Sequence, residues 1–308
     1  MIYNVLKKAM KNLIIRASLI FFTVNLSYSQ EWMTSLEIAQ KLALMQNKTV
    51  LMVWEEATKY PYLVYVDDEK GGTIVIGNLF EDEKMSQLIW ENFVPVIVSE
   101  SQHASLYKKV KGKRKQRYID KFNDDSIKVM DANGNIINTS YVAEDYLDIA
   151  KLIKNYALNT QLVTLELEAY KKEKNFYSAY YLASKYLDLA VYVNEAIRSE
   201  IIDLSNIYLD EAVGFLEIEA TEDKSTLKQR AELLKIQEYL ILNRPKRVLR
   251  ELKKMDAENI ESTNEALVNF LYYTAYSILK DEKNIELWKT KVSLLNLKKA
   301  QMIININT

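Results

Sequence analysis

Glycine and proline are rare in this chain, and nearly all of them lie in its first half. The 308 residues include 6 glycines and 3 prolines, where an average chain of this length would hold roughly 20 and 15. All but one residue of each type lie before residue 135, and the short β-branched runs at 49–53, 73–76, 94–98, 127–129 and 136–137 are likewise confined to the first half. Because tight turns between strands use these residues, we expect an α/β region up to about residue 157 and only helices beyond it.

Within the first region, hydrophobic spacing and capping residues predict individual elements. Ser35 can cap a first helix that buries Ala39 and Ala43. Residues 81–92 form a second expected helix, with Met85 and Ile89 facing inward. Between the runs at 127–130 and 136–137, Asn133-Gly134 predicts a hairpin turn in which both residues have positive φ.

The second half shows helical periodicity and predicts three helix hairpins. They pair residues 175–190 with 194–215, 230–242 with 245–255, and 264–279 with 284–297. This arrangement resembles helical-repeat proteins of the tetratricopeptide type. The spacing is irregular and the signature residues of that repeat are missing, so a non-repetitive helical bundle remains the alternative.

Residues 1–29 have the features of a secretory signal peptide. Lys7, Lys8, Lys11 and Arg16 provide a basic segment, residues 19–26 a short apolar one, and 27–29 place small residues before a cut at Gln30. The apolar run is shorter than the roughly 20 residues that a membrane span needs, so we expect cleavage and export rather than an anchor. Met10 is an alternative start. No transmembrane segment is expected after removal of the signal.

Several segments of residues 31–156 resemble the thioredoxin-like family. The first match is Trp32 before a capped helix, followed by residues 47–51 and Trp54. A later helix and strand of the family are matched by residues 79–83 and 90–96. The strand and Asp-x-x-Gly hairpin of the family are matched by residues 127–134. The resemblance implies a thioredoxin-like domain over residues 30–157, followed by a helical domain over 158–308.

The same segments depart from that family where its chemistry takes place. The Cys-x-x-Cys motif should follow Trp54, but Glu55 and Glu56 stand there. The cis-proline of the family should come directly before the strand that starts at Ile127, but residues 122–126 contain no proline. Thiol–disulfide exchange needs a thiolate, and this chain has no cysteine. The domain is therefore redox-inactive, and the fold is expected to serve as a binding frame.

Composition excludes further classes of active site. Without cysteine there is no disulfide, no thiol nucleophile and no thiolate ligand for zinc or iron–sulfur clusters. With His103 as the single histidine, a multi-histidine metal site is impossible. We expect no enzyme activity, no cofactor and no metal. The net charge of −1 gives no indication of nucleic acid as a partner.

The strongest local anomaly is a basic strip that extends from Lys108 to Lys121, with eight cations and one acid. Such a strip is either a solvated surface or a docking site for an acidic protein or another anionic surface. Alternatively, it neutralises the acidic residues near 55–56, 67–69 and 81–83 within the fold. Its central cations are the first candidate partner-binding residues: Lys113, Arg114, Lys115 and Arg117.

Aromatic and acidic residues supply the remaining candidates. Trp54, Glu55 and Glu56 occupy the position of the lost redox motif. Tyrosine is abundant, with 21 copies, and adjacent tyrosines on a helix cannot both face one core. Tyr181, and Tyr272 or its neighbour Tyr273, are therefore expected to be exposed contacts.

These observations together predict a non-enzymatic exported protein-interaction module. It would act in the bacterial cell envelope, periplasmic or envelope-associated, as a scaffold, assembly factor or chaperone-like subunit for envelope proteins. The alternative is a periplasmic peptide- or ligand-binding module that uses the groove of the degenerate thioredoxin-like domain beside Trp54.

Overall fold

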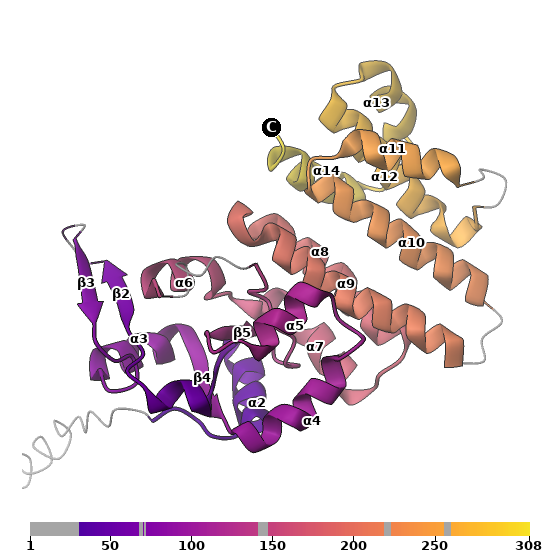
Figure 1. Ribbon diagram of the computed structural model, residues 1–308. Helices are drawn as coiled ribbons and strands as arrows, with labels where there is room; N and C mark the ends of the chain where they lie inside the picture. Colours follow the sequence, from indigo (N-terminus) through magenta and orange to yellow (C-terminus); the bar gives the residue numbers. More distant parts are fainter. Residues whose placement is uncertain (1–30, 68–69, 71, 141–146, 219–222, 256–259) are drawn as a thin grey trace, which may run out of the picture. The chain divides into compact units, whose positions relative to one another are not determined.

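The computed structural model describes residues 31–67, 70, 72–140, 147–218, 223–255 and 260–308. From Trp32 onward the chain forms one compact unit. It consists of a small mixed α/β region followed by a helix-rich part, as the sequence predicts (Figure 1). The signal-peptide prediction for residues 1–29 lies outside the described residues.

The α/β region contains a three-stranded sheet in the order β4-β1-β5. Strand β1 (Thr49–Trp54) pairs in parallel with β4 (Phe93–Val98) and antiparallel with β5 (Lys128–Met130). A separate hairpin joins β2 (Val64–Asp67) and β3 (Thr73–Ile76). The expected strands at 49–53, 73–76, 94–98 and 127–129 are confirmed, whereas the run at 136–137 contributes only a bridge between Ile136 and Met130.

Helices cover this sheet and connect its strands. They are α2 (Leu36–Gln46), α3 (Glu83–Asn92), α4 (Glu100–Val110), α5 (Gln116–Asn123) and α6 (Ile149–Tyr156). The predicted cap of the first helix is confirmed, because the Ser35 side chain accepts a hydrogen bond from the Ile38 amide. The second helix begins at Glu83 rather than residue 81, because Asp82 caps it by accepting from the Met85 amide.

Successive side chains of strand β1 belong to two different hydrophobic clusters, because they point to opposite faces of a sheet that is buried on both sides. Val50, Met52 and Trp54 pack with α2 and α5 in one cluster. Leu51 and Val53 belong to the other cluster, which also contains residues of α3 and α6. The sheet is therefore the middle layer of the α/β region.

The turn after β5 differs from the sequence prediction in one detail. Gly134 has φ of +86°, but Asn133 is not among the described residues with positive φ. The reason is that the Asp131 carboxylate accepts hydrogen bonds from the Asn133 and Asn135 amides, both at 2.9 Å, and so closes the turn from within. The positive φ of Gly134 favours glycine here, because side chains strain this conformation; a β-carbon would also lie 2.4 Å from Nε2 of the flexible Gln40 side chain, which would have to move.

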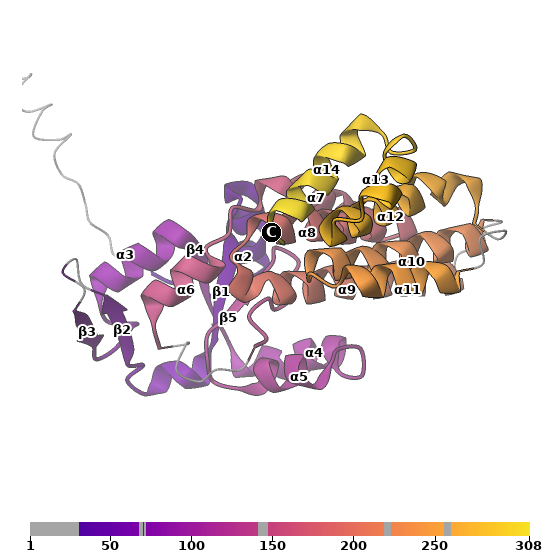
Figure 2. The same ribbon diagram turned by 90° about the horizontal axis from the view of Figure 1, so that it is seen from above.

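The helix-rich part packs consecutive helices against one another, and α9, α10 and α11 lie side by side in Figure 2. Its helices are α7 (Thr164–Lys172), α8 (Phe176–Tyr192), α9 (Glu195–Ile218), α10 (Lys224–Ile241), α11 (Pro245–Lys254), α12 (Glu265–Leu279), α13 (Glu282–Lys289) and α14 (Leu294–Asn305). The first two predicted hairpins correspond to α8–α9 and α10–α11. The third was wrong in its second arm: residues 284–297 are interrupted, because Ser293 caps a new helix, α14.

The larger hydrophobic cluster is continuous across the predicted domain boundary near residue 157. It includes Leu51 of β1, Leu152 of α6 and Val163, and it continues through α8 and α9 into α12 and α14. The boundary at 157 remains a prediction, and a fragment can test it directly.

Two buried carboxylates also join the two halves of the chain. Asp131, in the turn after β5, is 1% exposed and accepts hydrogen bonds from the hydroxyls of Tyr208 on α9 and Tyr186 on α8. Glu200 of α9 is equally buried and accepts from the Tyr156 hydroxyl of α6 and the Ser140 amide, both at 2.6 Å. Burial raises the pKa of both carboxyl groups, because the charged form loses its hydration. The surrounding hydrogen-bond donors compensate for this loss and stabilise the carboxylates in the folded protein.

A fragment that ends at residue 157 would lose Tyr186, Tyr208 and the helices that cover the larger cluster. We therefore expect residues 30–157 to form a molten or aggregating species without a cooperative thermal transition, whereas residues 30–308 unfold in one transition. Circular dichroism and calorimetry on the two proteins measure this directly. Cooperative unfolding of the fragment would instead establish residues 30–157 as an independent domain.

Candidate functional site

The basic strip divides into two parts of different character. It covers the end of α4, the turn over residues 111–115 and nearly all of α5. Lys108, Lys109, Lys111 and Lys113 are exposed, while Arg114, Lys115 and Arg117 reach α9. We call the first group the exposed lysines and the second group the anchoring cations.

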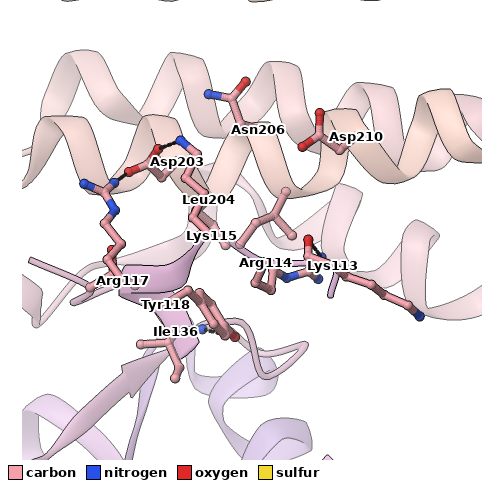
Figure 3. A pocket seen from close by; sticks show the side chains of 12 residues that line it. Lys113, Arg114, Lys115, Arg117, Tyr118, Ile136, Asp203, Leu204, Asn206 and Asp210 are labelled. Carbon is pink, nitrogen blue, oxygen red and sulfur yellow. Dashed lines mark hydrogen bonds and ion pairs between the residues drawn. The ribbon is translucent and has the colours of Figure 1, made fainter. Parts of the chain in front are cut away.

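The anchoring cations pair with acids of α9, and Figure 3 shows Lys115 and Arg117 at the Asp203 carboxylate. Arg114 lies 2.8 Å from Glu211, with only 10% of its side chain exposed. Lys115 lies 2.8 Å from Asp203, and Arg117 pairs with the same carboxylate. The strip is therefore neutralised in part within the fold, by acids of α9. Among the described acids that the sequence suggested, neither Asp67 nor those at 81–83 pair with it, and residues 68–69 lie outside the described residues.

Arg114 also connects these ion pairs to the buried turn after β5. Its guanidinium donates to the Asn135 side chain at 3.1 Å, and the Tyr170 hydroxyl of α7 donates to the second oxygen of Glu211. Charged hydrogen bonds of this kind are stronger than neutral ones. The anchoring cations consequently hold the turn between α4 and α5 in a defined position.

A small cavity lies between the anchoring cations and α9 (Figure 3). Tyr118, Ile136, Leu204 and Asp210 are among the residues that line it, and its volume is about 50 Å³. A single water needs roughly 10–15 Å³ of such space. The cavity therefore holds a few waters and is too small for an organic substrate.

The exposed lysines protrude beside this anchored segment. Gly112 allows the turn between them with φ of +73°. None of the four lysines forms an ion pair with a described acidic residue; Lys111 lies 5.6 Å from the ring of Tyr107. Four cations without a described acidic partner, at the end of α4 and on the turn that follows it, can attract an anionic partner.

The position of the lost redox motif lies at the end of β1. Trp54 is 2% exposed, donates its indole N–H to the Phe122 carbonyl at 2.8 Å, and packs edge-on against His103 at 4.7 Å. Glu55 and Glu56 follow in a short 3₁₀ helix and are exposed, and Glu56 pairs with Lys59. Trp54 is thus part of the core, whereas the two glutamates face solvent.

Two buried lysines near Trp54 were missed by the sequence analysis. Lys121 of α5 and Lys128 of β5 are 2% and 0% exposed, and both lie close to Asp124. Lys128 donates to the Ser126 carbonyl at 2.8 Å and lies 5.6 Å from the Trp54 ring. Burial lowers the pKa of Lys121 to about 7 and that of Lys128 to about 8.

These lowered pKa values make the stability of the fold depend on pH. Between pH 7 and 10.5 the unfolded chain binds more protons at Lys121 than the folded one, so stability rises with pH and is lost as pH falls toward 7. We expect the free energy of unfolding to rise by about 3 kcal/mol between pH 7 and 9, with about 2 kcal/mol from Lys121 and about 1 kcal/mol from Lys128. In Lys121→Met this rise should be smaller.

Chemical denaturation at several pH values measures this dependence. Lys109→Met, which removes an exposed lysine of α4, is the matched control and should retain the wild-type slope. Parallel pH profiles for the wild type and Lys121→Met would show that Lys121 has an ordinary pKa in the folded protein.

The two candidate tyrosines have different surroundings. Tyr181 of α8 is 53% exposed and stacks on Tyr177, whose exposure is 47%. Tyr272 of α12 is only partly exposed, because its ring stacks on Trp288 of α13 at 4.2 Å. Tyr181 therefore presents an aromatic surface to solvent, and Tyr272 mainly fixes α13 against α12.

The described residues contain neither a metal-binding cluster nor a membrane-spanning helix. Within them, no group of three or more histidine, aspartate or glutamate side chains is arranged to hold a metal ion. Among the same residues, no helix has the length and apolar character required to cross a membrane.

Comparisons with known proteins found no match. The sequence matches no protein-family model and no curated protein, and the fold matches no solved structure.

Proposed function

We propose that this chain is a non-enzymatic, exported protein-interaction module, and that it serves as a scaffold, assembly factor or chaperone-like subunit in the bacterial cell envelope. The supporting observation is the division of the basic strip. Ion pairs to Asp203 and Glu211 fix the segment, while Lys108, Lys109, Lys111 and Lys113 remain exposed beside it. A surface that is already ordered loses less entropy when a partner binds.

The α/β region is proposed to be a redox-inactive thioredoxin-like domain. The sheet order β4-β1-β5, with one parallel and one antiparallel neighbour for β1, supports this proposal. So does the short connection from β5 to Ile136, which bridges back to Met130. In the helix-rich part, the packing of α8 on α9 and of α10 on α11 supports a tetratricopeptide-like arrangement; the interrupted third hairpin favours an irregular one.

The alternative, a ligand groove beside Trp54, has less support. The indole ring is buried and its N–H already donates to Phe122. A ligand would have to displace the packing of His103 and Phe122 before it reached the ring. The exposed lysines need no such rearrangement.

Charge reversal of the exposed lysines tests the proposed partner surface. In the triple variant Lys109→Glu/Lys111→Glu/Lys113→Glu, we expect at least a 10-fold loss of the envelope proteins that the wild type retains, and little change in melting temperature, because exposed charges contribute about 0–1 kcal/mol per pair. Wild-type binding should weaken with salt, since screening acts within about 8 Å at physiological ionic strength.

The matched control reverses three exposed lysines at the end of α7 and just after it, in Lys171→Glu/Lys172→Glu/Lys174→Glu. It changes the net charge by the same amount and should bind as the wild type does. Quantitative pull-down from envelope fractions with both variants gives the comparison. Equal retention by both variants would remove the support for this surface.

Export is tested separately by the mature N-terminus. We expect native protein purified from its source to begin at Gln30 or its cyclised form, because residues 1–29 have the charge and apolar pattern of a signal peptide. Intact-mass and N-terminal peptide analysis measures this. Residues 10–29 on the purified protein would contradict the proposed cleavage.

A further inference from the structure

A cationic hollow lies where the loop before α11 meets the end of α12, and its volume is about 580 Å³. Its polar wall includes Arg244, Lys246, Arg247 and Arg250, and Ile278 and Leu279 contribute an apolar wall. This volume is within the 300–1,000 Å³ range of small-molecule sites. It is also more than ten times that of the cavity beside the anchoring cations.

The positions of the cations in this hollow are unfavourable for the stability of helix α11. Helix α11 begins at Pro245, and no acid lies in its first turn. Arg244, Lys246 and Arg247 thus surround the end of the helix where the backbone dipole is positive and where anions, not cations, are favourable. Lys246 and Arg250 are also like charges four residues apart, which is unfavourable on a helix.

Three of these four cations lack an acidic partner in the described parts of the chain. Arg250 pairs with Glu251 at 3.3 Å, but Arg244, Lys246 and Arg247 form no ion pair with a described residue. The Arg247 guanidinium lies over the Tyr239 ring at 4.0 Å, and its buried Nε–H has no hydrogen-bond acceptor among the described residues. Stacking fixes the plane of the guanidinium, and a fixed guanidinium is suited to bidentate recognition of oxyanions.

We infer that this hollow binds a small, soluble organic phosphate. The phosphate group takes its place among Arg244, Lys246 and Arg247 at the start of α11, where a helix N-terminus also favours an anion. The apolar part of the ligand lies against Ile278 and Leu279. Three unpaired cations match the double negative charge of a phosphate monoester better than the single charge of a carboxylate.

This site does not involve the exposed lysines and is independent of the proposed partner surface. Isothermal titration of protein 30–308 with phenyl phosphate should show saturable binding. Binding should be at least 5-fold weaker for inorganic phosphate, which lacks the apolar group, and for benzoate, which has one negative charge. Benzyl alcohol, without charge, should not bind.

Two variants and one control assign the binding to the hollow. Arg244→Gln/Lys246→Gln and Lys246→Gln/Arg247→Gln should each weaken phenyl phosphate binding at least 10-fold. Because the first pair removes cations that oppose the helix dipole, that variant should melt at or above the wild-type temperature, which separates loss of binding from loss of folding. Lys253→Gln/Lys289→Gln removes two exposed cations that do not line the hollow and should bind as the wild type does.

The inference is overturned by any of three results. These are no saturable binding of phenyl phosphate, equal binding of phenyl and inorganic phosphate, or unchanged binding in both hollow variants. Binding to vesicles that contain phosphatidic acid, without binding of phenyl phosphate, would also overturn it, because the occupant would then be a membrane surface and not a soluble molecule.

Discussion

The carboxylate of Asp131 is the interaction on which the relation between the two halves depends. It lies in a turn of the α/β region, yet two of its four donors are the hydroxyls of Tyr186 and Tyr208 from α8 and α9. A buried carboxylate is costly unless such donors surround it. For Glu200 the roles of the two halves are exchanged: the carboxylate belongs to α9 of the helix-rich part, and its donors, Tyr156 and Ser140, belong to the α/β region. Polar groups that are satisfied only when both halves are present favour one relative placement of the halves.

The anchored strip extends this relation to the surface. Arg114 bonds at once to Asn135, in the turn that Asp131 closes, and to Glu211 of α9. The exposed lysines therefore lie at the end of α4 and on the turn that follows it, and Arg114 fixes the position of this turn against the core. Exposed charges contribute little to folding, but they govern encounter and orientation when a partner approaches. In the proposed interaction surface, the anchoring cations fix the segment and the exposed lysines contact the partner.

The candidate site was only partly predictable from the sequence. The basic strip is visible as a run of charges, but a run does not show that Arg114, Lys115 and Arg117 face acids about 90 residues further along the chain. Lys121 was counted among the surface cations, although it is buried beside Asp124. Lys128 lies in a strand whose neighbours are all buried, and the Asp124 carboxylate and the loop carbonyls that accept its hydrogen bonds explain its position. The hollow at α11 depends on residues of α12 that sequence spacing does not connect to it.

Local chemistry was determined by the sequence alone. The absence of cysteine excludes thiol chemistry whatever the fold, and hydrophobic period, caps and glycine positions place most helices and strands because these are short-range properties. Which charges are paired, which tyrosines are exposed and how the two halves share a core were decided by the tertiary structure. Those properties depend on contacts between residues that are distant in the sequence. Burial and ion pairing change the free energy of a charged group more than its neighbours in the sequence do.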